Sequence, residues 1–206
     1  MGARSDTVRI RNHFRRRDLV IASILNAMPL EPLASAANPA GYFGRICREI
    51  ISQQLGSGAV GAITKRFCAL FPRGRATPAR VAQLCEDDLR SAGMSWAKAR
   101  TLRDLAKKIL AGDIRFSGFA SASDEEVIAE LTRVKGIGRW TAEMFLIFTL
   151  GREDVFSMGD LALRKGLARL YGRRANGKKS AEAIIRLWSP YRSYACLALW
   201  HRADAE

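Results

Sequence analysis

The chain has 206 residues, 48% of them hydrophobic, which excludes bulk disorder and suits one domain or two closely associated subdomains. It carries 34 lysines and arginines against 20 acidic residues, a formal net charge of +14. Because basic residues placed at phosphates release condensed counterions, this excess indicates a polyanionic partner, with nucleic acid as the leading candidate. The alternative is a solvated basic surface without such a partner.

The cysteines and histidines limit the chemistry. The four cysteines lie far apart without a C-x-x-C pair, which is typical of buried, reduced thiols in a cytosolic protein. The only histidines are His13 and His201. Two histidines and widely spaced cysteines are too few to build a zinc site, and they make a catalytic histidine triad unexpected.

The chain shows no membrane or export signal. The apolar run over residues 19–25 is too short to span a bilayer, and no small-residue cleavage pattern follows it. We therefore expect no membrane association and no secretion. The expected location is the cytoplasm of a bacterium or the nucleus of a eukaryote.

The N-terminal segment, residues 1–41, is expected to be a basic arm followed by a helix that packs with the C-terminal part of the chain. Six arginines precede an apolar helical pattern that begins at Leu19. We expect the extreme N-terminus to be mobile. Its arginines could contact DNA, direct the chain to an organelle or form a solvated tail.

The central segment, residues 42–152, shows a series of short helices. Helical periodicity resumes at Tyr42 and runs into residues 52–55, and Thr77 before a proline is typical of a helix N-cap. A further helix opens over residues 85–89, and an amphipathic helix over residues 98–110 is stopped by Gly112.

Two helices separated by a glycine-rich bend follow at about residues 123–150. Ser123 and Glu126 form a capping box for a helix through Arg133, and a second helix runs over residues 140–150 with Gly151 as its stop. The C-terminal segment, residues 153–206, shows helices over residues 160–171 and 180–188 and one starting near residue 190. No strand-like alternation persists, so the predicted fold is all-α.

The bend itself reads Gly136-Ile137-Gly138. Its two glycines allow backbone dihedrals that side chains forbid, so successive amide groups can converge on one anion beside a helix N-terminus. This arrangement favours a phosphate-binding site. An inert turn between two helices is the alternative.

Asp160 stands twenty positions after Trp140, at the start of the next amphipathic helix. Its simplest role is that of an N-cap. The positive end of a helix dipole also stabilises a negative charge, which suits a carboxylate that stabilises a nearby cation rather than one that accepts a proton. Both roles can hold together.

These features resemble the helix-hairpin-helix DNA glycosylases, in which a glycine-rich hairpin precedes an aspartate. Three further segments resemble the alkylated-base branch, 3-methyladenine DNA glycosylase II and its relatives: Ile-Ile-Ser-Gln-Gln-Leu at 50–55, Gly-Met-Ser-Trp-Ala-Lys-Ala-Arg at 93–100, and Ser-Pro-Tyr-Arg-Ser-Tyr-Ala at 189–195 followed by Leu199-Trp200. The resemblance covers about residues 40–202 in four blocks. It departs from the family pattern at Gly56 and Gly58, within an expected helix, and at Met158-Gly159.

The resemblance implies two helical subdomains with an active-site cleft between them. Asp160 corresponds to the catalytic aspartate, Trp140 and Trp200 to aromatic walls of the base pocket, and Gln54 to the residue that fills the gap left by an extruded nucleotide. Core packing for the two tryptophans and a polar surface role for the glutamine are the alternatives.

The resemblance also implies a phosphate clamp formed by the backbone amides of Gly136, Gly138 and Thr141. The hairpin carbonyls of Val134 and Gly136 are the expected ligands of a monovalent cation, Na⁺ or K⁺. No other metal or cofactor is expected. No group of four cysteines follows Asp160, so the iron–sulfur cluster of other branches is not expected.

The implied activity is that of a monofunctional DNA glycosylase acting on double-stranded DNA. Trp140 stands where strand-cutting relatives carry a nucleophilic lysine, and an indole cannot form a Schiff base. The chain is therefore expected to act as a monomer in base excision repair and to release alkylated purines such as 3-methyladenine. A glycosylase for oxidised or deaminated purines and a non-catalytic DNA-binding protein are the alternatives.

Overall fold

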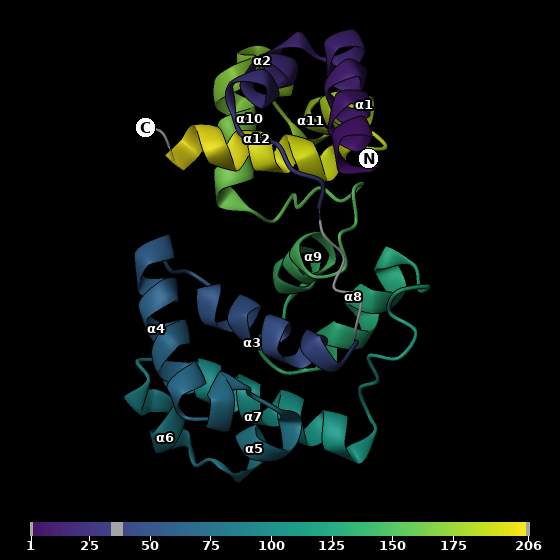
Figure 1. The fold of residues 1–206 in the computed structure, drawn as a ribbon. Helices are drawn as coiled ribbons and strands as arrows, with labels where there is room; N and C mark the ends of the chain where they lie inside the picture. The colour runs from purple at the N-terminus through teal and green to yellow at the C-terminus, as the bar shows by residue number, and fades with distance from the viewer. Residues whose placement is uncertain (1, 34–38, 205–206) are drawn as a thin grey trace. The chain divides into compact units, whose positions relative to one another are not determined.

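A computed structural model describes residues 2–33 and 39–204 of the chain. Within these ranges the regular elements are all helical, so the predicted all-α fold is confirmed (Figure 1). The chain divides into two compact units: a terminal unit formed by residues 1–34 and 151–206, and a central unit formed by residues 35–150. The divisions predicted from the sequence fall after residues 41 and 152.

The central unit is built from seven α-helices and two short 3₁₀ turns among its described residues. They are η1 (Pro39–Gly41), α3 (Tyr42–Ser52), α4 (Ser57–Ala69), η2 (Pro72–Gly74), α5 (Pro78–Gln83), α6 (Glu86–Ser91), α7 (Trp96–Ala111), α8 (Asp124–Thr132) and α9 (Arg139–Phe148). Aromatic rings join its core: Tyr42 and Phe145 lie 5.6 Å apart in an edge-to-face arrangement. The contact holds α3 against α9, the second helix of the hairpin.

Local capping explains several of these boundaries. The predicted capping box at the start of α8 is confirmed: the Glu126 amide donates to Ser123 Oγ at 3.3 Å, and the Ser123 amide donates to Glu126 Oε2 at 2.7 Å. Thr77 caps α5 as predicted. Gly112 ends α7 with φ +80°, a left-handed conformation that glycine adopts without strain.

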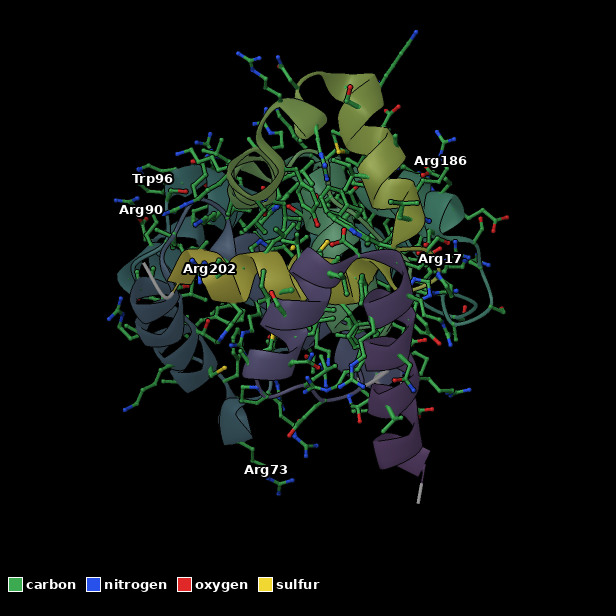
Figure 2. The ribbon with its side chains drawn as sticks, turned by 90° about the horizontal axis from the view of Figure 1, so that it is seen from above. Arg17, Arg73, Arg90, Trp96, Arg186 and Arg202 are labelled. Atoms are coloured by element: carbon green, nitrogen blue, oxygen red, sulfur yellow. The ribbon has the colours of Figure 1, made fainter. Side chains whose placement is uncertain are left out.

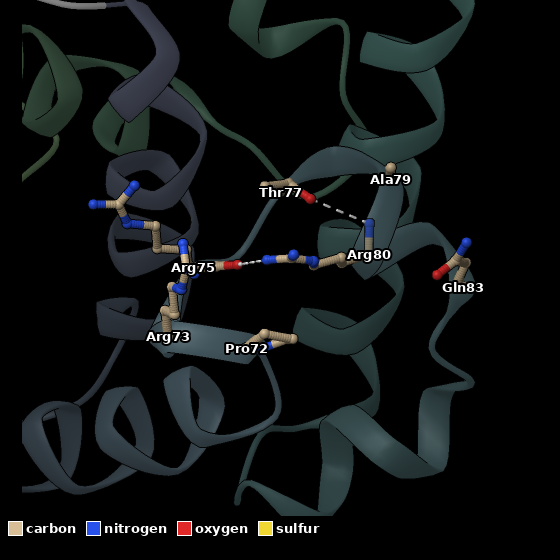
Figure 3. Close-up of a pocket in the computed structure, with 7 residues that line it drawn as sticks. All are labelled: Pro72, Arg73, Arg75, Thr77, Ala79, Arg80 and Gln83. Atoms are coloured by element: carbon tan, nitrogen blue, oxygen red, sulfur yellow. Dashed lines mark hydrogen bonds between the residues drawn. The ribbon is translucent and has the colours of Figure 1, made fainter.

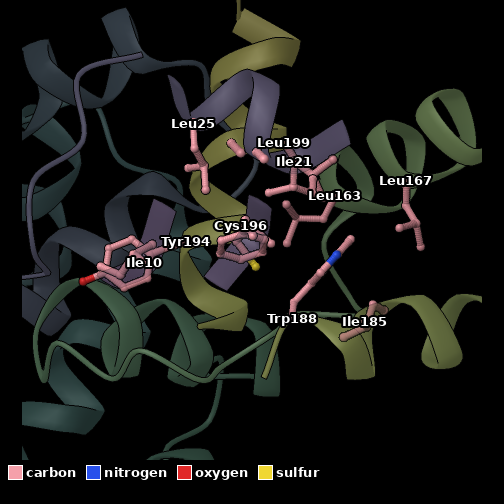
Figure 4. Close-up of a cluster of buried hydrophobic side chains, with 14 of the residues drawn as sticks. Ile10, Ile21, Leu25, Leu163, Leu167, Ile185, Trp188, Tyr194, Cys196 and Leu199 are labelled. Atoms are coloured by element: carbon pink, nitrogen blue, oxygen red, sulfur yellow. The ribbon is translucent and has the colours of Figure 1, made fainter. Parts of the chain in front are cut away.

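The terminal unit combines helices from both ends of the chain. They are α1 (Gly2–Arg17), α2 (Leu19–Ala27), α10 (Leu161–Tyr171), η3 (Gly172–Ala175), α11 (Lys178–Leu187) and α12 (Arg192–Asp204). Ile21 and Leu25 of α2 meet Leu163 of α10 and Leu199 of α12 in one buried cluster (Figure 4). No helix in the described part of the chain is both long and apolar enough to cross a membrane.

The arginine-rich N-terminal segment forms helix α1, which begins at Gly2, and the mobility of the extreme N-terminus stays a prediction. Ile10 and Phe14, four residues apart and therefore on one face of the helix, are 1% and 0% exposed within the core of the terminal unit. The basic residues Arg15 and Arg16 remain exposed. Burial of two large apolar side chains stabilises this segment as a helix despite its high charge.

Asp18 connects the two N-terminal helices to the C-terminal ones. Its Oδ1 accepts the amides of Val20 and Ile21 at 3.0 and 3.2 Å, which caps α2. Its Oδ2 accepts the hydroxyl of Tyr171 at 2.6 Å and Nε1 of Trp188 at 2.7 Å. Burial and the bond to Asp18 raise the pKa of Tyr171, which therefore stays a hydrogen-bond donor.

Helices α10 and α12 approach closely at Gly166. A Cβ atom at this position would lie 3.2 Å from a methyl carbon of Leu199, tighter than an ordinary van der Waals contact. The small residue therefore lets α10 lie directly on α12. The same two helices bring Asp160, the N-cap of α10, next to Trp200 of α12.

Candidate functional site

The hairpin between α8 and α9 depends on glycine at one of its two glycine positions. Gly136 has φ +94°, and a Cβ there would lie 2.0 Å from Thr101 Oγ1, so both its conformation and its surroundings require glycine. Gly138 has φ −93° and ψ 174°, and a Cβ there would meet no atom within 4 Å. The prediction that both glycines adopt dihedrals closed to other residues is therefore wrong for Gly138.

Amide groups of the hairpin are aimed outward at the start of α9. Gly138 is the N-cap residue, and the first helical bond of α9 runs from the Ala142 amide to Gly138 O at 3.2 Å. Helix geometry directs the amides of residues 139–141 out of the N-terminus. Gly136 and Gly138 are exposed, whereas the Thr141 side chain is buried. The backbone thus presents donors where the sequence predicted an anion site.

Arg139 ties the two hairpin helices together. Its guanidinium donates to both carboxylate oxygens of Glu125 on α8, at 3.0 and 2.5 Å, and to Glu143 on α9 at 2.9 Å. The bond to Glu125 is the main cause of a raised pKa for this arginine. These bonds fix the spacing of α8 and α9 around the bend.

The hairpin carbonyls that were predicted to hold a monovalent cation already accept hydrogen bonds. Val134 O accepts the Ile137 amide at 3.0 Å, and Gly136 O accepts Gln53 Nε2 at 3.0 Å. Each carbonyl keeps a second lone pair, which is compatible with a weakly held cation. Among the residues that the structure describes, no group of three or more histidines, cysteines or acidic residues could hold a metal ion.

The four cysteines form no disulfide and differ in exposure. Cys47 and Cys196 are buried, as expected, whereas Cys68 is half-buried. Cys85 is exposed instead, because it occupies the N-cap of α6, where its Sγ accepts the Asp88 amide at 3.4 Å.

A tight turn between α3 and α4, residues 53–56, carries Gln54; we call it the Gln54 turn. The predicted continuation of the helix to Leu55 is wrong, because α3 ends at Ser52 and Gln54 adopts φ +57°. Gly56 is the N-cap of α4 rather than a residue within a helix. A left-handed conformation at a residue other than glycine is uncommon and strained, and such residues cluster at functional sites. Arg73 in η2 adopts the same conformation, with φ +56°.

Leu55 belongs to the same turn and was not among the predicted site residues. Its side chain is 38% exposed, next to the exposed Gln54. The turn therefore offers a polar and an apolar side chain side by side. The sequence predicted a helix at this position. An exposed leucine indicates a candidate DNA contact only when the strained turn that carries it is known.

Asp160 is the N-cap of α10, as predicted. Its Oδ1 accepts the Leu163 amide at 2.9 Å and Nε1 of Trp200 at 3.4 Å, and the residue is 8% exposed. The terminal unit thus brings together Asp160 and Trp200, forty positions apart in the chain. The remaining predicted site residues, including Trp140 in the first turn of α9, belong to the central unit.

Basic side chains spread over the surface, and several extend into solvent, among them Arg17, Arg73 and Arg186 (Figure 2). Residues 50–85 hold five lysines and arginines and no acidic residue. In this stretch a hollow of about 700 Å³ forms at η2 and α5 (Figure 3). Its lining includes Arg73, Arg75 and Arg80, and Arg80 donates to the carbonyl of Arg75 at 3.2 Å.

The central unit contains two helices joined by a glycine bend, and the next helix in the chain, α10, is capped by an aspartate. Together with the basic surface, these features are those of a helix-hairpin-helix protein. Residues 47–190 match the model of the HhH-GPD superfamily of base excision DNA repair proteins, and the chain belongs to this family. The resemblance to its 3-methyladenine glycosylase branch is confirmed by curated relatives with that name.

Three relatives illustrate the similarity. DNA-3-methyladenine glycosylase 1 of Schizosaccharomyces pombe is 35% identical over 161 residues, which cover 77% of this chain and 71% of the relative. The alkylbase DNA glycosidase-like protein mag2 of the same yeast is 29% identical over 208 residues, 98% of this chain and 94% of the relative. The solved structure of 3-methyladenine DNA glycosylase Mag1 of that yeast, in complex with abasic DNA, matches with a TM-score of 0.81 at 28% identity, covering 95% of this chain and 97% of that one.

Proposed function

We propose that this chain is a monofunctional DNA glycosylase of base excision repair that extrudes alkylated purines such as 3-methyladenine from double-stranded DNA and hydrolyses their N-glycosidic bond. The observation that carries the proposal is the Asp160 carboxylate, held by the Leu163 amide and the Trp200 indole. Membership of a base excision repair family and the names of the relatives support it.

The leaving group supplies part of the catalysis. Alkylation of a ring nitrogen makes the purine cationic, so it departs without protonation and no general acid is required. A cation over an indole face gains about 0.5–2 kcal/mol, depending on desolvation. Trp140 and Trp200, both half-buried, are the proposed aromatic walls for such a base.

The proposed role of Asp160 is to stabilise the sugar. Breaking the bond leaves an oxocarbenium-like deoxyribose, as in glycoside hydrolysis. A buried carboxylate interacts with that developing charge more strongly than one in water, and its two hydrogen-bond donors keep it in one orientation. The same carboxylate orients the water that completes the hydrolysis.

Base extrusion costs a few kcal/mol, and this cost is lower for a damaged base that pairs badly. The proposed clamp for the DNA backbone consists of the amides of Gly136, Gly138 and Thr141. Gln54 fills the vacated stack, and the neighbouring Leu55 adds an apolar surface of the kind that wedges between bases. The strained conformation of Gln54 supports this role.

We also propose that the protein does not cut the DNA strand at the abasic site, because Trp140 has no amine that could act as a nucleophile. A Na⁺ or K⁺ at the carbonyls of Val134 and Gly136 would add charge stabilisation at the hairpin, and no iron–sulfur cofactor is proposed. We further propose that the chain acts as a monomer on damaged DNA, in the bacterial cytoplasm or a eukaryotic nucleus.

Base release from duplexes with one lesion each tests the proposal. A panel of 3-methyladenine, 7-methylguanine, an oxidised purine and a deaminated purine separates the alkylated-base activity from its closest alternatives. We expect the wild type to release the methylated bases and D160N to release none while binding DNA normally, since asparagine also caps helices well. D113N, at an exposed aspartate in a turn, is the matched control.

Three results would contradict the proposal. Retained release by D160N would exclude Asp160 as the catalytic group. Binding to DNA without release of any base would support a non-catalytic DNA-binding protein instead. A covalent complex trapped by borohydride on abasic DNA would show a lyase step and exclude the monofunctional mechanism.

A further inference from the structure

The C-terminal end of α3 is capped by a lysine from another helix. Lys98 Nζ on α7 donates to the carbonyls of Ile51 and Gln53, both at 2.8 Å. These carbonyls lie at the negative end of the α3 dipole, where a cation is favoured. Burial lowers the pKa of Lys98, which is consistent with an ammonium group that has left bulk water for these two acceptors.

Gln53 links the same end of α3 to the hairpin. Its Nε2 donates to Gly136 O at 3.0 Å and to Thr141 Oγ1 at 2.9 Å. The side-chain NH₂ group of Gln53 therefore uses one N–H to bond the bend and the other to bond the first turn of α9. Gln53 directly precedes Gln54, so the side chain that contacts the hairpin and the residue that adopts the strained conformation are neighbours in the chain.

Helix α7 supports both partners. Lys98 contacts the end of α3, and Thr101, one turn further along α7, lies against Gly136 so closely that a Cβ there would be 2.0 Å from its hydroxyl oxygen. The Thr101 hydroxyl donates to the carbonyl of Ala97 at 2.9 Å, which fixes its position. The Gln54 turn and the hairpin are thus held by the same two turns of one helix.

We propose that Gln53 and Lys98 are positioning residues that hold the Gln54 turn in a fixed register against the hairpin, so that insertion into the base stack and gripping of the DNA backbone occur as one event. This inference rests on the proposed function of the two segments. Neither side chain needs to touch the damaged base. Loss of either one lets the turn move independently of the bend while the hairpin continues to bind phosphate.

Insertion can be measured without base release on a duplex with an abasic-site analogue next to 2-aminopurine, whose fluorescence rises when its stacking is disturbed. We expect K98M to bind this duplex within about threefold of wild type. Q53E adds a negative charge beside the proposed phosphate clamp and should bind more weakly. Both variants should lose most of the fluorescence rise at saturation. Q53E keeps the shape of the side chain and replaces the donor by an acceptor. Q83E and K107M, at exposed positions of the same unit, are the matched controls.

A full fluorescence rise with Q53E or K98M would overturn the inference. An equal loss with the controls, or a thermal midpoint reduced so far that binding also fails in both variants, would overturn it as well, because the effect would then be general destabilisation. Release of methylated bases by the wild type is scored separately. A wild type that opens the stack but releases no base therefore rejects the proposed function and not this inference.

Discussion

Trp200 Nε1 and Asp160 Oδ1 lie 3.4 Å apart, so the tryptophan that is predicted to line the base pocket directs its indole N–H at the carboxylate. The distance is long for such a bond, and the shorter bond from the Leu163 amide, 2.9 Å, holds the same oxygen. We therefore assign two proposed roles to Trp200: its ring stacks on the base, and its N–H orients the carboxylate proposed to do the chemistry.

Replacing Trp200 by phenylalanine separates these roles. W200F keeps an aromatic face and removes the N–H, and a hydrogen bond to a charged group is worth about 1.5–3 kcal/mol at good geometry, so we expect roughly a fivefold to twentyfold slower base release for this longer bond. Single-turnover kinetics at saturating enzyme measure the rate. Equal rates for W200F and wild type, with a slow W200A, would leave stacking as the only role.

The two hairpin glycines should respond differently to alanine. G136A combines a positive φ with a clash against Thr101, and we expect a loss of about 2–4 kcal/mol in the free energy of unfolding. G138A has an allowed backbone and open space, so its stability should stay within about 0.5 kcal/mol of wild type.

DNA affinity supplies the second measurement for this pair. A methyl group at position 138 would stand between the outward amides and a phosphate, so we expect G138A to bind duplex DNA about tenfold more weakly, with a smaller salt dependence. Urea unfolding and titration at two salt concentrations test both expectations. Unchanged affinity in G138A would argue against the phosphate clamp.

Asp18 is predicted to be a main determinant of the stability of the terminal unit. D18A removes a helix cap and leaves the donors of Tyr171 and Trp188 without their acceptor, so we expect a loss of about 2–4 kcal/mol in the free energy of unfolding. D18N keeps the cap and should be intermediate. Chemical denaturation measures the loss, with D6A, at an exposed surface ion pair, as the control; equal stability of D18A and D6A would contradict this role.

The ionisation of Asp154 makes the free energy of unfolding depend on pH in the acidic range. Burial opposes its ionisation, but the bonds from Arg192 at 2.7 and 3.0 Å and from Ser189 at 2.8 Å prevail, and the pKa of this carboxyl is lowered. Its contribution to stability is therefore present above the ordinary pKa of an aspartate, about 3.9, and is lost as the pH falls through the lower pKa of the folded state. The side chain is 33% exposed, so solvent screening reduces the contribution.

The corresponding variant is D154N. We expect it to be less stable than wild type by about 1 kcal/mol at pH 7 and to approach wild type near pH 2.5. Urea unfolding at a series of pH values gives the difference. A difference that stays constant over this range would show that ionisation of Asp154 does not contribute.

The local signals in the sequence were sufficient for much of the fold. Ser123, Thr77 and Asp160 each cap the helix that follows them, because an N-cap bond involves only residues two or three positions apart. The same locality made the hairpin recognisable. The resemblance then supplied roles for residues far apart in the chain.

The errors arose where distant contacts decide the structure. Helix α3 stops at Ser52 because Lys98, forty-six positions later, caps its carbonyls, and no signal near residue 52 announces this. The helix in the arginine-rich N-terminal segment was not predicted, because the burial of Phe14 depends on helices at the other end of the chain. The roles of Gln53 and Asp18 were missed for the same reason, since their partners lie in other elements.

The division of the chain also determines the order in which its parts are completed. Residues 35–150 are continuous, whereas the terminal unit needs α1 and α2 from one end and α10 to α12 from the other. Because synthesis proceeds from the N-terminus and folding units form as they emerge, the hairpin and the Gln54 turn are complete on the ribosome while the first two helices still lack their partners. A growing chain would therefore complete the segments that we propose to hold DNA before it acquires Asp160, the proposed catalytic group.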